Sequence, residues 1–165
     1  MSRRRLTILA SAALLLAALV GGVTAQSGEC PRWREAFASM PMRMLSIQMG
    51  SKTFAIRVKL ADTGERQAGG FQCATREDIQ RELILFDFGQ EITTQFHMQN
   101  VPAALDIAFI KGDGRIFSIL RMDPSPTTLY GPMGSFRYAL EARAGFFEGQ
   151  GIRQGEARLM TPQVR

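Results

Sequence analysis

The sequence predicts a mainly β, single-domain protein, either an antiparallel β-sandwich or a partly open barrel, with one or two short helices. Several short runs alternate apolar and polar residues, which is typical of strands with one buried face. Turns rich in glycine and proline separate these runs, and no linker or repeat divides the chain. The 140 residues that follow the first 25 are enough for one well-buried core.

The first 25 residues have the layout of a secretory signal peptide. Arg3, Arg4 and Arg5 form a basic start, residues 6–20 are almost all apolar, and Val23-Thr24-Ala25 is a small-residue cleavage site. About 15 apolar residues fall short of the roughly 20 that span a bilayer. We therefore expect cleavage, no transmembrane segment afterwards, and a periplasmic or extracellular protein. The expected divisions are a signal peptide (1–25), a leader (26–42), a β-rich domain (43–161) and a tail (162–165).

The first strands are expected directly after the leader, which is itself expected to be loop with one weak helical turn. Apolar residues occupy every second position in 45–49 and again in 54–60, and Gly50-Ser51 separates the two runs. This pattern predicts a β-hairpin. Two short helices should follow. The first covers 63–68, with Asp62 and Glu65 as a capping box, and the second begins at Thr75.

The remaining elements are predicted as strands. A glycine at position 89 is expected to separate the strands 83–88 and 92–99, and the turn 111–114 to join a hairpin. A loop rich in proline and glycine covers 123–134, and the glycines between 145 and 155 bracket a turn or short helix. The expected later strands are 105–110, 115–122, 136–141 and 156–160.

The charge of the chain argues against a nucleic-acid partner. The sequence has 20 Lys and Arg against 15 Asp and Glu, but three of these arginines lie in the signal peptide. The remaining 17 basic and 15 acidic residues give a net charge of +2, and no basic stripe occurs.

The two cysteines, Cys30 and Cys73, form an even pair in a chain that we expect to be exported. An oxidising compartment favours a disulfide between them. The alternative is two separate cysteines, one of them buried as a small apolar residue.

Polar residues on one predicted strand are the candidate ligand-binding residues. In the strand 92–99, alternation places Thr93, Gln95, His97 and Gln99 on the same face. This face, with Tyr130 from the neighbouring loop as an aromatic contact, could bind a small polar ligand such as a carbohydrate. The alternative is that it is only the solvated face of an antiparallel sheet.

Asp106 is an acid inside the apolar run 105–110, where an unpaired carboxylate costs several kcal/mol. It is either a carboxylate with a shifted pKa at a cleft or a structural acid that accepts backbone N–H groups or pairs with an arginine. With His97 it is the weak catalytic candidate. One histidine and two cysteines without metal-like spacing predict no metal site, and no motif calls for a cofactor.

One stretch carries a resemblance to a known family. The run Phe96–Asn100, the run Leu105–Ile110 and Asp113-Gly114-Arg115 resemble the family called domain of unknown function 192, and weaker matches extend from about Phe54 to Leu159. The resemblance implies a compact, mainly β domain, often exported, with no established activity. The chain departs from the family's usual residues at four positions: Cys73, His97, Gln99 and Glu156.

These observations favour an exported, non-enzymatic β-domain that binds a small polar ligand or an envelope partner. The first alternative is a hydrolase, on carbohydrate for example, that uses Asp106 and His97. The second is a purely structural, envelope-associated protein. No recognisable catalytic motif occurs in the chain, so the question of enzymatic activity stays open with a leaning toward none.

Overall fold

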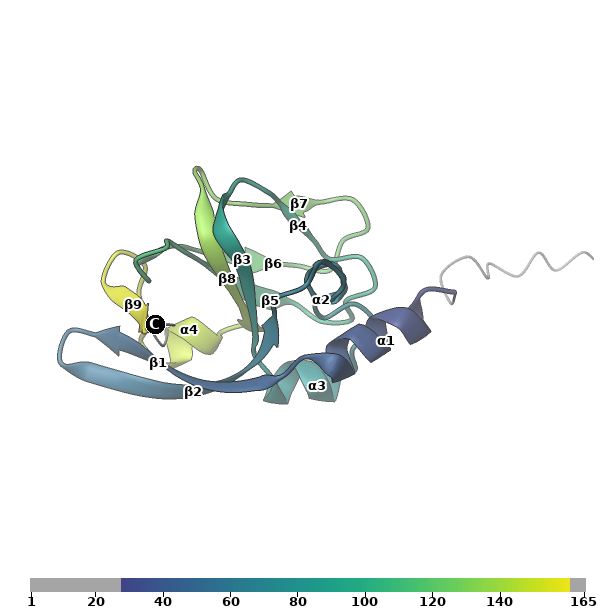
Figure 1. Cartoon of the computed structure of the whole chain (residues 1–165), viewed down its shortest axis with the longest axis horizontal. Coiled ribbons are helices and arrows are strands. Elements are labelled where there is room, and N and C mark those ends of the chain that lie inside the picture. Colours follow the sequence, from purple (N-terminus) through teal and green to yellow (C-terminus); the bar gives the residue numbers. More distant parts are fainter. Residues whose placement is uncertain (1–27, 161–165) are drawn as a thin grey trace, which may run out of the picture.

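The computed structural model describes residues 28–160, and a curled seven-stranded sheet dominates this part of the chain (Figure 1). Its strands lie in the order β6-β5-β8-β3-β2-β1-β9, and a separate ribbon pairs β4 with β7. The mainly β prediction is confirmed, in the form of a half-open barrel. The expected signal peptide (1–25) and tail (162–165) lie outside the described residues.

The strands and helices have the following bounds. The strands are β1 (Met42–Met49), β2 (Lys52–Ala61), β3 (Ile84–Ile92), β4 (Phe96–His97), β5 (Leu105–Ile110), β6 (Ile116–Met122), β7 (Leu129–Tyr130), β8 (Phe136–Arg143) and β9 (Ala157–Met160). The helices are α1 (Cys30–Ser39), α2 (Gly64–Gly69), α3 (Arg76–Arg81) and α4 (Phe146–Gly149). Among residues 28–160, no helix combines the length and the apolar character needed to cross a membrane.

Both predicted hairpins are confirmed. β1 and β2 pair antiparallel around Gly50-Ser51, with Met49 opposite Lys52. β5 and β6 pair antiparallel from Leu105 opposite Met122 onward. One pair departs from the antiparallel expectation, because β2 and β3 run parallel and are connected through α2 and α3.

The predicted strand 92–99 is wrong. β3 continues through Gly89 to Ile92, and the backbone N–H of Gly89 donates to Asp87 Oδ1 at 2.8 Å within a local irregularity of the pairing with β8. A β-bulge of this kind bends a strand without ending it. The chain then leaves the main sheet, and only Phe96 and His97 pair again, with Tyr130 and Leu129 of β7.

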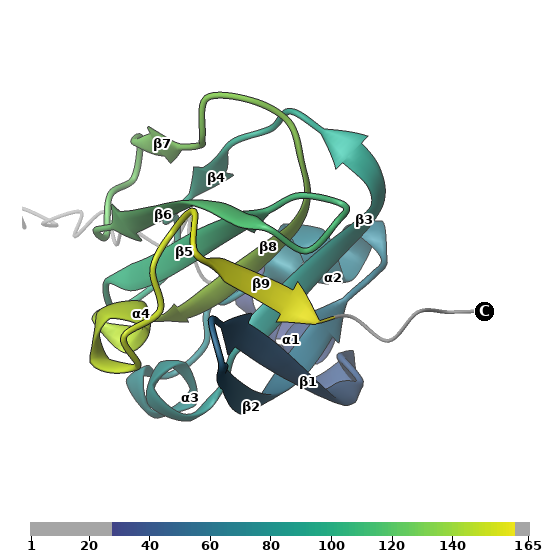
Figure 2. The same cartoon turned by 90° about the vertical axis from the view of Figure 1, so that its left-hand side faces the viewer.

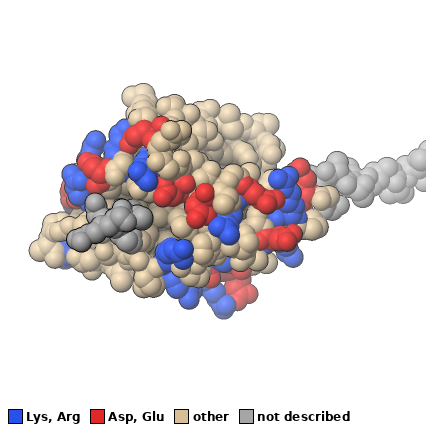
Figure 3. All heavy atoms as spheres, in the orientation of Figure 1, with Lys and Arg blue, Asp and Glu red and all other residues tan. Residues whose placement is uncertain are grey.

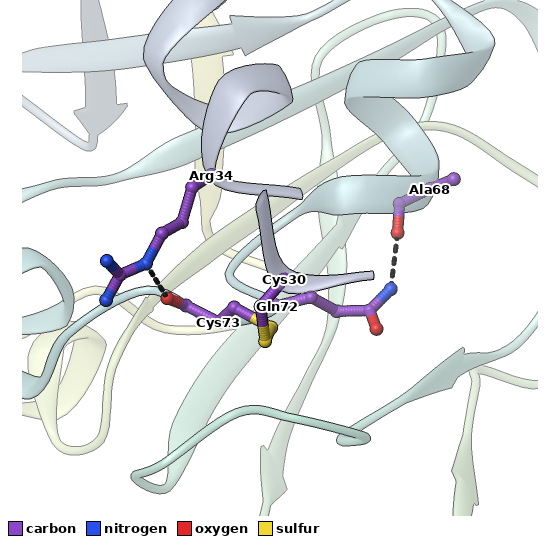
Figure 4. Close-up of a disulfide and its surroundings, with 5 residues drawn as sticks. All are labelled: Cys30, Arg34, Ala68, Gln72 and Cys73. Carbon is purple, nitrogen blue, oxygen red and sulfur yellow. Dashed lines mark hydrogen bonds between the residues drawn. A yellow bond between two sulfur atoms is a disulfide. The ribbon is translucent and has the colours of Figure 1, made fainter. Parts of the chain in front are cut away.

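The leader is also different from the prediction, because residues 30–39 form a helix that belongs to the domain. α1 begins with Pro31 in its first turn and buries Trp33 and Ala36. It packs against α2 where Gly69 leaves no room for a side chain, with Ala36 Cβ 3.1 Å from the position a Cβ of residue 69 would take. The disulfide between Cys30 and Cys73 joins its first turn to the segment that follows α2 (Figure 4).

The capping of the short helices is partly as predicted. α3 begins after Thr75 as predicted, and Thr75 and Asp78 form a capping box there. At α2 the N-cap is Thr63, whose hydroxyl accepts from the N–H of Arg66, whereas Asp62 pairs with the Arg66 guanidinium at 2.7 Å.

Two apolar cores lie on the two faces of the sheet, so β5, residues 84–86 of β3 and residues 138–142 of β8 are buried on both sides. All six residues of β5 are buried. One core lies inside the curl, where β1, β2, β9 and α4 meet the central strands; the other lies on the opposite face, beneath α3, the loop after α2 and the β4–β7 ribbon. A carboxylate in these segments is therefore removed from water, whereas Asp87 and Glu91 farther along β3 stay partly exposed.

The curl of the sheet brings its two edge strands together (Figure 2). Arg115 bridges to Arg158, the N–H of Leu159 donates to the carbonyl of Gly114 at 2.8 Å, and the N–H of Gly155 donates to Ile116. A Cβ at position 114 would lie 2.2 Å from the carbonyl oxygen of Leu159, so the closure requires glycine there.

We expect Gly114→Ala to destabilise the protein by about 2 kcal/mol or more, because the added methyl group separates the strands at the closure and φ of residue 114 is +87°. The control is Gly112→Ala in the same turn, where the nearest atom would be Glu91 Oε1 at 3.5 Å. Urea denaturation of both variants measures the difference. Equal midpoints would mean that the edge strands do not depend on this close approach.

Candidate functional site

The most unusual side chain of the molecule is Glu141, an acid in the middle of the doubly covered part of the sheet. It lies on β8 between Ile84 of β3 and Ile107 of β5, which are its partners across the strands. The residue is 4% exposed. It belongs to the face that carries Ala139, so its carboxyl group enters the core beneath the loop after α2.

The carboxyl group of Glu141 has no partner that would compensate for its burial. Its Oε2 is shut off from solvent and accepts no hydrogen bond from residues 28–160. The backbone of Gly70 passes directly over it, and a Cβ there would lie 3.5 Å from this oxygen. Burial penalises the charged form and raises the pKa of Glu141 to about 8. At neutral pH the acid is therefore mostly protonated.

Glu141 forms part of a pocket of about 270 Å³, which we call the Glu141 pocket. The loop after α2 forms one wall, and the ends of β3 and β4 form the other. The lining residues are Gln67, Ala68, Gly69, Gly70, Phe71, Gln72, Phe86, Phe88, Thr94, Gln95, Phe96, His97, Val101 and Glu141. A concave site with apolar walls and a few converging polar groups is the usual form of a small-molecule site.

Local hydrogen bonds and the disulfide hold the wall that α2 and its following loop provide. Gln67 Nε2 donates to the carbonyl of Asp87 at 2.8 Å, which ties α2 to β3. Gln72 is buried, and its Nε2 donates to the carbonyl of Ala68 at 2.7 Å (Figure 4). The next residue is Cys73, whose disulfide anchors the loop to α1. The N–H of Cys73 also donates to Asn100, so the loop is fixed on two sides.

The structure brings two of the predicted binding residues to this pocket. Gln95 and His97 line it, although they do not share the face of one long strand. His97 is exposed, and its Nδ1 accepts the N–H of Gln99 at 3.3 Å.

The other predicted binding residues lie elsewhere. Gln99 lines a different hollow, beside Pro124 and Pro126, and donates to the carbonyl of Pro126 at 3.3 Å. Tyr130 uses its hydroxyl within its own loop, accepting from the N–H of Asp123 and donating to the Asp123 carbonyl. Thr93 is exposed and is not among the lining residues of the Glu141 pocket.

Asp106 is buried like Glu141, but its carboxylate is fully engaged. Oδ1 accepts from Arg121 Nε at 2.5 Å, and Oδ2 accepts the N–H of Gly145 at 2.7 Å. Gly145 is the N-cap of α4, so Asp106 joins β5, β6 and the turn before that helix. It lines a hollow with Glu148 and Arg153, on another part of the surface from His97. The structure does not bring Asp106 and His97 together.

Groups that could hold a metal ion do not converge. Across residues 28–160, no three side chains of His, Cys, Asp or Glu cluster as ligands. Figure 3 shows acidic and basic side chains interspersed across one face, while the region around β4 and β7 carries few charges.

Glu141 was not among the candidates from the sequence. It stands at a polar position of an alternating run, which is where a solvent-facing acid is expected in a half-buried strand. The available signal is its immediate neighbourhood, Ala139, Leu140 and Ala142, since small and apolar neighbours on both faces indicate a strand that is covered twice.

We expect Asp106→Ala to lower the free energy of unfolding by more than about 1.5 kcal/mol, because it leaves the Gly145 N–H and the Arg121 guanidinium without their acceptor. Asp106→Asn keeps an acceptor oxygen and should cost less. Chemical denaturation compares the three proteins. An alanine variant with the stability of the unmodified chain would favour a functional role for this acid.

Glu141 should make stability depend on pH. Its pKa is about 8 in the folded protein against an ordinary value of 4.5, so between these values the folded state holds a proton that the unfolded chain has released. The contribution of Glu141 to the free energy of unfolding is fully favourable below pH 4.5, decreases as the pH rises, and levels off above pH 8. The free energy of unfolding should fall by an amount on the order of 3 kcal/mol between pH 5 and 8. Glu141→Gln should flatten this dependence.

Urea denaturation at pH 5, 6, 7 and 8 measures this effect, and Glu156→Gln is the control because Glu156 is an exposed carboxyl group. If the two variants show the same pH dependence, Glu141 is not protonated in the folded protein.

The comparisons with known proteins agree with this fold. A protein from Sinorhizobium meliloti 1021, provisionally named a transcription regulator, is 26% identical, with a TM-score of 0.66 over 73% of this chain and 94% of its own. A protein of unknown function from Novosphingobium aromaticivorans DSM 12444 is 24% identical, with a TM-score of 0.64 over 73% of this chain and 85% of its own, and shows the fold alone.

No curated protein matches the chain. The sequence profile of DUF192, described as "Uncharacterized ACR", matches residues 45–158. That range includes the β5–β6 hairpin, most of the β1–β2 hairpin and every strand that borders the Glu141 pocket. The chain therefore belongs to the DUF192 family.

Proposed function

We propose that the protein is an exported, non-enzymatic binding module, and that it holds a small polar ligand in the Glu141 pocket. The observation that carries this proposal is the buried carboxyl group without a partner in the lining of an open pocket. A buried polar group without a hydrogen bond costs free energy. A ligand that supplies the missing partner recovers it.

Export rests on the N-terminal sequence and agrees with the cysteine chemistry. The basic start, the apolar run and the small-residue site before Gln26 are the features that secretion requires. The disulfide between Cys30 and Cys73 is a bond that persists in the periplasm or outside the cell. It also fixes the loop beside Gln72, which forms one wall of the pocket. A compartment that preserves the disulfide therefore also preserves this wall.

A binding role fits the described groups better than catalysis. Both cysteines are joined to each other, so neither is a nucleophile. Asp106 is held by Arg121 and Gly145 in a separate hollow, which leaves the proposed pair of Asp106 and His97 without a common substrate position. The regulator name of the Sinorhizobium protein is not carried over, since residues 26–165 hold 17 basic and 15 acidic residues without a basic stripe.

We expect a ligand to raise the melting temperature in a thermal-shift screen, since binding to the folded state alone stabilises it. The panel contains sugars, cell-wall fragments, amino acids, amines and metal ions. His97→Trp should weaken the binding of the best compound at least tenfold, because the larger ring enters the Glu141 pocket. Because His97 is exposed, the substitution should leave the free energy of unfolding within about ±0.5 kcal/mol of that of the unmodified protein.

The matched control is Leu129→Trp. Leu129 is the partner of His97 across the β4–β7 ribbon, is 56% exposed, and is not a lining residue of the pocket. The Leu129→Trp variant should bind the compound with the affinity of the unmodified protein. Equal affinities in both variants would place the ligand elsewhere, and a panel without any stabilising compound would contradict a binding function for small polar molecules.

A further inference from the structure

The polar side chains that line the Glu141 pocket are amides, one hydroxyl, the imidazole of His97 and the acid Glu141. No Lys or Arg is among its lining residues, and Glu141 has no cation within the described chain to pair with. Elsewhere in the molecule, the carboxylates of Asp62, Asp106 and Glu77 each pair with an arginine. The pocket thus provides a site for positive charge that the fold itself leaves empty.

The apolar wall of the pocket is aromatic. Phe86, Phe88 and Phe96 all line it, and their rings form one cluster. Phe86 and Phe96 meet edge to face, with centroids 5.2 Å apart, and Phe88 and Phe96 lie 6.5 Å apart at 77°. The negative faces of such rings attract organic cations, and the attraction grows when water is excluded.

From this combination we infer that the Glu141 pocket binds a small organic cation, with its ammonium group between the phenylalanine cluster and the carboxylate of Glu141. The inference rests on the proposed function and names the chemical class of its ligand. The carboxylate supplies the charge, and the rings supply a surface that suits alkyl groups around a nitrogen atom. A sugar would use neither feature as fully, since its hydroxyl groups call for several hydrogen-bond partners.

The size of the pocket suits this class. Pockets for drug-sized ligands start at about 300 Å³, so a volume of about 270 Å³ favours a small ammonium compound over an oligosaccharide or a peptide.

Binding a cation here must move a proton. Burial keeps the Glu141 acid protonated at neutral pH, and a positive charge beside it favours the ionised form. The proton then leaves to solvent as the ion pair forms. Of the residues that line the pocket, from α2 to β3, β4 and β8, Glu141 and His97 are the titratable ones. The variant His97→Gln, measured in parallel, shows how much of the proton release comes from His97.

The experiment compares choline with 3,3-dimethylbutan-1-ol, a neutral compound of the same shape, by isothermal titration calorimetry of the purified protein. We expect choline to bind at least tenfold more tightly. At pH 7, titrations in buffers of different ionisation enthalpy should show net release of protons as choline binds, as the raised pKa of Glu141 requires. Between pH 6 and 7 the affinity should rise severalfold, and well above the pKa of Glu141 it should become constant.

Glu141→Gln should remove both signatures: choline should bind no more tightly than the alcohol, and proton release should vanish. Glu156→Gln, at an exposed carboxyl group, should behave like the unmodified protein. Circular dichroism of both variants shows that each is folded.

The outcomes separate the two proposals. If the alcohol binds as tightly as choline, or a neutral sugar from the panel binds in the pocket while choline does not, the cation class is overturned and the binding module stands. Proton release that disappears in His97→Gln but persists in Glu141→Gln also overturns it. If no compound of the panel binds, the proposed function itself fails.

Discussion

The structure depends on the covering of both faces of its central strands. β5 is buried along its whole length, and β8 carries Tyr138, Leu140 and Ala142 to the core inside the curl while its other face enters a second core. The hydrophobic effect drives this double burial. Its consequence is that a side chain in the doubly buried segments cannot reach water simply by pointing away from one core. Every polar group there needs a hydrogen-bond or ion-pair partner, either from the protein or from a ligand.

Elements with a strong local pattern could be predicted from the sequence, and elements that tertiary contacts decide could not. The hairpin around Gly50-Ser51 follows from strict alternation on both sides of a two-residue turn, so its register is local information. α1 has weak local signals, and its stability comes from the burial of Trp33 and from the disulfide at Cys30. The end of β3 was misplaced because Gly89 produces a bulge rather than a break.

The site was predictable only in part, for a related reason. His97 and Gln95 were candidates because polar residues alternated with apolar ones, and both do line the pocket. Glu141 satisfied the same alternation and was therefore taken for an ordinary polar position. Alternation shows which residues share a face, but it does not show what covers that face. In this fold the cover comes from the loop around Gly70, more than 70 residues earlier in the chain.

Asp106 and Glu141 are both acids on doubly covered strands, and the difference between them carries the functional argument. Asp106 has two partners in the protein, so the architecture alone accounts for it: it joins β6 to the turn before α4. Glu141 has none, and burial raises its pKa, so it lowers the stability of the folded state above pH 4.5. An apolar side chain of similar size would serve the packing better. A group that the fold does not need, and that opens onto a pocket with aromatic walls, is best explained by a partner from outside the chain.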